Sequence, residues 1–163
     1  MSKTKLKSDI EKKKFNGIFG KKNDLVYTPK PFYDELDKEF GFDFDPCPID
    51  PQFDGLKAEW GKCNFVNPPY SSIPKWIEKG IKECKKGKKC VFLVPIRPNS
   101  KYWANNVYKN VTSIRYISPI VFQGYDTPLR IPLCLLIFDP LDEKHTSKFE
   151  HVQKSTYNYF EHK

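Results

Sequence analysis

A turn of one amide, two prolines and one aromatic ring follows a short apolar run in this chain of 163 residues. The apolar run covers residues 63–66, and the turn is Asn67-Pro68-Pro69-Tyr70. Each proline fixes its φ at about −65° and lacks an N–H group, so the turn is stiff and its carbonyl oxygens are uncontested. The Asn67 side-chain oxygen and the Pro68 carbonyl could accept both hydrogens of one amino group, while Tyr70 could stack on a ring. The turn therefore predicts a site for the amino group of a base or an amide; the alternative is a loop that only ends a strand.

The composition is typical of one globular domain with a basic charge. Hydrophobic residues make up 39% of the chain and aromatic residues 15%, which is enough for a core. Residues 1–22 are predicted to form a basic flexible arm, residues 23–140 the folded domain and residues 141–163 a polar extension. The net charge of +8 favours a polyanion such as nucleic acid as partner; the alternative is that the basic arm is a solvated tail that only aids solubility.

Several protein classes are not expected from the sequence. There is no run of about 18 apolar residues, so no membrane span is predicted. The basic N-terminus has no apolar segment behind it, which argues against secretion and favours the cytoplasm or the nucleus of a host cell. The five cysteines form no CxxC pair and the three histidines all lie in the C-terminal extension, so we expect reduced thiols and no metal site.

The first half of the domain contains one clear helical pattern. Phe32, Leu36 and Phe40 recur four residues apart, which predicts a short amphipathic helix that ends at Gly41. Residues 42–44 alternate apolar and acidic side chains like a short strand, which the prolines after it would end.

The second half alternates between strand and helix patterns. Helical spacing relates Ile73, Trp76, Ile77, Ile81 and Cys84, and Gly87 is the predicted end of that helix. Strands are predicted at residues 90–94, 113–117 and 133–138, with a helix over residues 101–109. This alternation predicts an α/β fold with a mainly parallel sheet flanked by helices.

Ligands of such folds bind beyond the carboxyl ends of the strands. Asp45, Asn67 and Pro95 each follow a predicted strand. We therefore expect these three residues to line one rim of the sheet.

Several motifs occur together in this chain. They are Tyr27-Thr28-Pro29, Phe40-Gly41-Phe42 with Asp45 beyond it, Asp54-Gly55-Leu56 with Trp60, Asn67 to Ser71 with Trp76, and Leu93-Val94-Pro95. In this combination the chain resembles the amino-group methyltransferases that use S-adenosylmethionine, and most closely the short phage-type DNA N6-adenine methyltransferases. The resemblance covers roughly residues 24–140 and implies a compact, trimmed Rossmann-like methyltransferase fold.

The resemblance also implies which residues bind the cofactor. They are Tyr27, Thr28 and Pro29 at its amino-acid end, Asp45, Pro46 and Cys47 beside its charged amino group, and Asp54 and Leu56 at its adenine. The alternatives are that Asp45 only caps a turn and that the segment around Gly55 is a plain turn.

For the acceptor, the resemblance implies that Asn67, Pro68, Pro69 and Tyr70 hold an adenine that has left the DNA duplex. The amino nitrogen of adenine is a poor nucleophile because its lone pair is delocalised into the ring. Acceptors placed on its two hydrogens favour the sp3 nitrogen that develops in the transition state. Tyr70 would stack on the base, and no covalent intermediate is needed.

Residues predicted to contact DNA are the basic side chains Lys75, Arg97, Lys101 and Arg130 and the aromatic residue Phe122. Each basic residue could equally be a solvated surface charge. For Phe122 the alternative is an ordinary place in the core.

The chain departs from the larger methyltransferases in two places. The segment after Asp45 has no glycine-rich loop, and only 21 residues separate Asp45 from Asn67. Two further strands with their helices cannot fit in that space. We therefore expect a trimmed sheet that is thin over the cofactor, with either modest cofactor affinity or a second subunit, in a homodimer, covering that edge.

Other acceptors and a non-catalytic role are the competing hypotheses. The same turn could serve cytosine N4, adenine in RNA or a protein glutamine amide. Enzymes that resemble the cytosine-N4 class tend to have serine at the position of Asn67, and the positive charge favours nucleic acid over a protein amide. A catalytically silent nucleic-acid-binding module is the remaining alternative.

Overall fold

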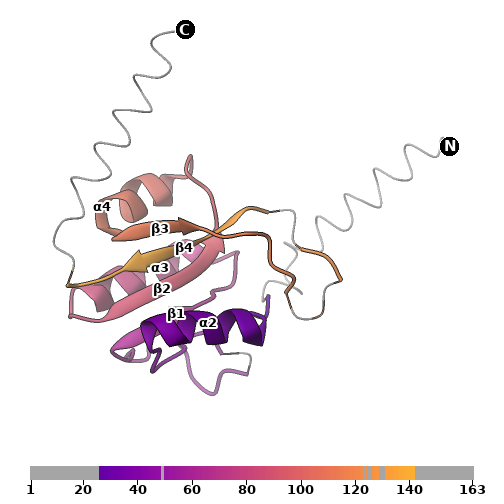
Figure 1. Ribbon diagram of the computed structural model, residues 1–163. Coiled ribbons are helices and arrows are strands. Elements are labelled where there is room, and N and C mark those ends of the chain that lie inside the picture. Colours follow the sequence, from indigo (N-terminus) through magenta and orange to yellow (C-terminus); the bar gives the residue numbers. More distant parts are fainter. Residues whose placement is uncertain (1–25, 49, 123, 125, 129–130, 142–163) are drawn as a thin grey trace, which may run out of the picture.

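The structure is a computed structural model that describes residues 26–141, apart from residues 49, 123, 125, 129 and 130 (Figure 1). The predicted basic arm at residues 1–22 and all but the first residue of the predicted C-terminal extension lie outside the described residues.

The predicted helices and strands occur in the predicted order, but one predicted strand is shorter than expected. The elements are α2 (Lys30–Phe40), β1 (Cys63–Val66), α3 (Ile73–Cys84), β2 (Lys89–Pro95), the π-helical turn η1 (Trp103–Val107), α4 (Tyr108–Asn110), β3 (Ser113–Tyr116) and β4 (Leu133–Phe138). The strand expected at residues 42–44 is a single parallel bridge between Phe44 and Asn64 at the outer edge of β1.

The four strands form a mixed sheet in the order β1-β2-β4-β3. β1 and β2 are parallel, but β4 is antiparallel to both of its neighbours, so the prediction of a mainly parallel sheet is wrong. Helices join β1 to β2 and β2 to β3, which keeps these three strands running in one direction. The described residues that connect β3 to β4 contain no helix. β4 therefore runs in the opposite direction, and it lies between β2 and β3 in the sheet.

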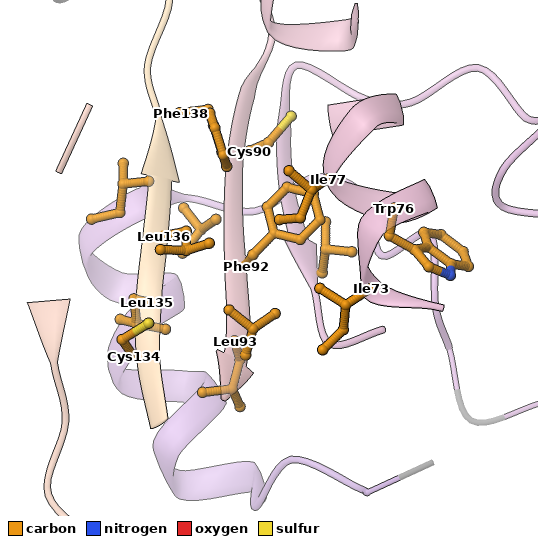
Figure 2. Packing of buried hydrophobic residues seen from close by; sticks show 14 of the residues in the cluster. Ile73, Trp76, Ile77, Cys90, Phe92, Leu93, Cys134, Leu135, Leu136 and Phe138 are labelled. Atoms are coloured by element: carbon orange, nitrogen blue, oxygen red, sulfur yellow. The ribbon is translucent and has the colours of Figure 1, made fainter. Parts of the chain in front are cut away.

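Helices cover both faces of this sheet, with α2 on one face and α3 on the other (Figure 1). Successive side chains of β1 alternate between the faces. Phe65 points to the α2 face, where its ring meets that of Tyr33 edge-on at 5.2 Å between centroids. Ile73 and Ile77 of α3 lie against Phe92 of β2 on the opposite face (Figure 2).

Two glycines account for the way these helices sit. Gly41 ends α2 as predicted, in the left-handed conformation with φ of 65°, and its N–H donates to the Asp37 carbonyl at 2.8 Å. Gly80 lies in the middle of α3, where an added Cβ would be 2.4 Å from the ring of Phe92. Only glycine therefore lets α3 approach the sheet this closely.

A buried carboxylate lies at the end of the sheet where β1 and β2 begin. Glu83 of α3 is fully buried and forms ion pairs with Lys79, Lys86 and Lys88 at 2.8–2.9 Å. Burial opposes the ionisation of Glu83, but the hydrogen bonds from the three lysines outweigh it and lower its pKa to about 2. Lys88 also donates to the Trp60 carbonyl, which joins α3 to the segment before β1.

Candidate active site

The Asn67–Tyr70 turn directly joins β1 to α3. Pro68 and Tyr70 are buried, and the Ser72 N–H donates to the Pro69 carbonyl at 3.0 Å, one residue before the helix begins. The strand, stiff turn and helix follow each other as the sequence predicts. With its ring only 7% exposed, Tyr70 is part of the core in this structure, and its stacking on a base stays a prediction.

The orientation of the Asn67 amide is determined by its neighbours. Its Nδ2 donates to the Val26 carbonyl and, at 3.0 Å, to Oγ1 of Thr28. Because a carbonyl can only accept, the amide nitrogen must be the atom that faces Val26. The oxygen Oδ1 then faces away, and it is buried without a hydrogen-bond donor among the described residues. The site therefore holds one oriented, unused acceptor.

Asn67 lies in the wall of a pocket of about 300 Å³ at the carboxyl end of β1. The pocket is also lined by the start of the described chain, the first turn of α2 and the segment after Phe44: Val26, Tyr27, Thr28, Lys30, Tyr33, Asp34, Asp45, Cys47, Pro48 and Phe65. The structure thus brings Asp45 and Asn67 to one rim, as predicted, while Pro95 is not among the residues that line the pocket.

Asp45 contributes a partly buried carboxyl group to this pocket. Burial raises the pKa of its carboxyl group to about 6, although the Cys47 N–H donates to Oδ1 at 2.8 Å and acts in the opposite direction. No lysine, arginine or histidine among the described residues forms an ion pair with Asp45. Within the described part of the chain the carboxylate is therefore partly desolvated and without a paired cation, an environment in which a cationic group would be favoured.

Tyr33 is a pocket residue that the sequence analysis missed. It follows Phe32 on α2, and its ring packs against Phe65 on one side of the pocket. Burial, followed by the nearby Asp37 and Asp45 carboxylates, raises the pKa of the Tyr33 phenol, so the hydroxyl stays neutral. The helical pattern identified Phe32, Leu36 and Phe40 and said nothing of Tyr33; its closeness in sequence to Thr28 was the one signal that could have found it.

The Asp54–Leu56 segment supports the pocket from outside. Asp54 is exposed, its Oδ1 accepts from the Leu56 N–H at 3.0 Å, and neither residue lines the pocket. Gly55 is buried, and a Cβ on it would lie 2.0 Å from the Pro46 carbonyl oxygen. The indole of Trp60 donates to the Gly55 carbonyl at 2.8 Å. These contacts hold the loop after Asp45 in place.

The residues predicted to contact DNA differ in their positions. Lys75, Arg97 and Lys101 are all exposed. Phe122 is 1% exposed and packs in the core. Arg130 lies outside the described residues.

The cysteines in the same part of the chain do not form a reactive or metal-binding site. All five cysteines are free thiols, and burial, followed by the nearby Asp45 carboxylate, raises the pKa of Cys47. Residues 26–141, with the gaps given above, contain no group of three or more His, Cys, Asp or Glu side chains placed to hold a metal ion. Over the same residues, none of the helices has the length and apolar character required to cross a membrane. The three histidines are outside the described residues.

The sheet, its flanking helices and the pocket at the carboxyl end of β1 define an α/β domain with a pocket at the edge of the sheet where such folds bind their ligands. A sequence model of the DNA N-6-adenine-methyltransferase (Dam) family matches residues 18–147, which is most of the chain. The chain therefore belongs to this family, whose general activity is the methylation of adenine N6 in DNA. No curated protein matches the chain.

Proposed function

We propose that this protein transfers a methyl group from S-adenosylmethionine to the N6 amino group of adenine in DNA. The observation that carries the proposal is the Asn67 amide, whose oxygen is oriented by Val26 and Thr28 and is left without a donor. An unused buried acceptor costs about 1–3 kcal/mol, which a donor from the substrate would recover.

The amino group of adenine supplies such a donor. A hydrogen bond from that amino group to the Asn67 oxygen strengthens as the nitrogen becomes tetrahedral, so it favours the transition state over the flat ground state. The oxygen is shielded from solvent, so a covering side chain must move before the base can reach it. The same shielding keeps water from competing for the acceptor during the reaction.

The residues around the pocket fit the cofactor. When bound, S-adenosylmethionine supplies an electrophilic methyl group on a positively charged sulfur. Asp45 would accept a hydrogen bond from its ammonium group and neutralise its charge, which matches a partly buried carboxylate that no cation of the described residues pairs with. The neutral ring of Tyr33 adds a face for cationic groups. A volume of about 300 Å³ is at the lower end of ligand pockets and suits the amino-acid half of the cofactor, in line with the trimmed sheet.

Exposed basic side chains would bind the DNA, and the target base would flip out of the duplex. Lys75 lies in the first turn of α3, shortly after the Asn67–Tyr70 turn. Arg97 and Lys101 follow β2, whose carboxyl end lies next to that of β1. Cations at this end of the sheet would contact phosphates and make binding depend on salt. The adenine would leave the duplex to reach Asn67.

Methyl transfer to defined acceptors tests this proposal. The full chain is incubated with S-adenosylmethionine and unmethylated duplex DNA, and the digested nucleosides are quantified by mass spectrometry. We expect N6-methyladenine, and a loss of about 100- to 1000-fold in rate for Asn67→Ala, the range found when one hydrogen-bonding group is removed from a preorganised active site.

Asn110→Ala is the matched control for that substitution. The Asn110 amide also holds a backbone carbonyl, that of Asn106, but it lies just before β3 at the other end of the sheet, and its removal should leave the rate unchanged. N4-methylcytosine, or methylation of RNA or of a glutamine amide without N6-methyladenine, would contradict the proposed acceptor. A folded protein that binds no S-adenosylmethionine would contradict the proposed reaction.

A further inference from the structure

Two motifs that are far apart in sequence meet in one hydrogen bond. Thr28 belongs to the turn that precedes α2, and Asn67 begins the turn after β1. The Thr28 hydroxyl oxygen accepts a hydrogen bond from Asn67 Nδ2 at 3.0 Å. Both residues line the same pocket. The contact therefore links the chain before the first helix to the residue that holds the unused acceptor.

This contact completes the orientation of the amide. The Asn67 amide nitrogen carries two hydrogens and donates to two acceptors, the Val26 carbonyl and the Thr28 hydroxyl. If the amide turned over, its oxygen would face the carbonyl oxygen of Val26, and two acceptors would repel each other. With Nδ2 held by two acceptors, the direction of Oδ1 is set by Val26 and Thr28 together.

We propose that Thr28 is a positioning residue for Asn67, whose amide its hydroxyl holds so that the oxygen stays directed toward the amino group of the target. The inference rests on the proposed function and deepens it. It differs from the role that the family resemblance implies for Thr28, which is a contact with the cofactor. A hydroxyl can accept one hydrogen bond and still donate another, so Thr28 could play either role. Removing the hydroxyl distinguishes them: loss of positioning lowers kcat, whereas loss of a cofactor contact raises the cofactor Kd.

Thr28→Val and Thr28→Ser separate these roles. Valine keeps the shape of threonine but removes the hydroxyl, so we expect kcat at saturating cofactor and DNA to fall about tenfold, the usual effect of one lost hydrogen bond, while the cofactor Kd changes less than about twofold. Serine restores the hydroxyl and should keep kcat within about twofold of the wild-type value. Thr28→Ala is measured beside them in case valine is not tolerated, with thermal unfolding of every variant.

Thr112→Val is the control for the loss of a threonine hydroxyl. Thr112 Oγ1 accepts from the Asp139 N–H at the opposite end of the sheet, so this variant should alter stability but not kcat. If Thr28→Val instead raised the cofactor Kd and kept kcat, or if Thr28→Ser lost as much activity as Thr28→Val, the positioning role would be overturned.

A second measurement needs neither cofactor nor DNA. The side-chain NH2 signals of Asn67 can be assigned in a 15N–1H spectrum from their absence in Asn67→Asp. Thr28→Val should shift these two signals, and Thr112→Val should not. Unchanged Asn67 signals in Thr28→Val would overturn the inference even if methyl transfer is confirmed, whereas shifted signals with no methylation by the wild-type chain would overturn only the proposed function.

Discussion

Replacing Asp45 by asparagine should make the unliganded protein more stable and its cofactor site weaker. Asparagine has nearly the same shape and keeps an oxygen for the Cys47 N–H, which donates to Asp45 Oδ1 at 2.8 Å. It removes only the charge that burial disfavours. The pKa of Asp45 is raised from 3.8 to about 6, so the folded state binds its proton more tightly than the unfolded state does.

This difference in pKa determines the sign and size of the change in the free energy of unfolding. Between about pH 4 and pH 6 the native protein holds a proton that the unfolded chain has released, so stability falls as the pH rises through this window. Above pH 6 the full cost of the ionised carboxylate is present. Roughly two pKa units correspond to about 3 kcal/mol at pH 7.5, and linkage leaves about 1 kcal/mol at pH 4.5. Asp45→Asn should recover these amounts at the two pH values.

Urea unfolding followed by tryptophan fluorescence measures this directly. We expect the free energy of unfolding of Asp45→Asn to exceed that of the wild type by about 2 kcal/mol more at pH 7.5 than at pH 4.5. Tyr33 and Cys47, whose pKa values burial and the charge of Asp45 raise, do not titrate in this pH range, so the difference isolates Asp45. An advantage that does not depend on pH, or a variant that is less stable at pH 7.5, would refute the assignment of a costly buried charge.

Two further substitutions test the buried ion pairs of Glu83 and the packing of the loop after Asp45. Glu83→Gln removes the carboxylate that three lysines bind, and we expect a loss of about 3 kcal/mol in the free energy of unfolding at pH 7, measured in urea. Because the pKa of Glu83 is lowered to about 2, this difference should shrink only when the pH falls below the unfolded value of 4.5 toward 2; a constant difference down to pH 2 would contradict it. Gly55→Ala places a Cβ 2.0 Å from the Pro46 carbonyl oxygen and 2.8 Å from the ring of Trp76, so the loop after Asp45 must move. Calorimetry should then show a weaker cofactor affinity, and an unchanged affinity would mean that this loop does not shape the site.

The local elements could be predicted because each has its own pattern. Helix α3 follows from apolar residues at helical spacing, and β2 from a continuous apolar run. The position of β4 could not be predicted in this way. Its sequence identifies a buried strand, but which two strands it separates depends on pairings with residues far away in the chain. The loop before β4, which lacks a helical pattern, was the signal for its reversed direction.

The site could be predicted in part for the same reason. The Asn67–Tyr70 turn carries its own stereochemistry, so its position between a strand and a helix could be inferred from the prolines. The partners of Asn67 could not, since the contacts with Val26 and Thr28 join segments about 40 residues apart. Tyr33 was missed because a helical pattern describes which side chains are apolar, whereas its place in the pocket depends on how α2 lies on Phe65.

The insertion of β4 between β2 and β3 has a consequence for how this chain folds. β4, the last strand of the described part of the chain, lies inside the sheet, and each of its residues from Leu133 to Phe138 is buried. Among the described strands, β2 has only β1 beside it and β3 has no partner until these residues have left the ribosome. The loops that β4 closes are long, so its pairing is a slow, late step that exposes strand edges beforehand. A nascent chain halted before residue 133 would therefore be a target for chaperones rather than a smaller working domain.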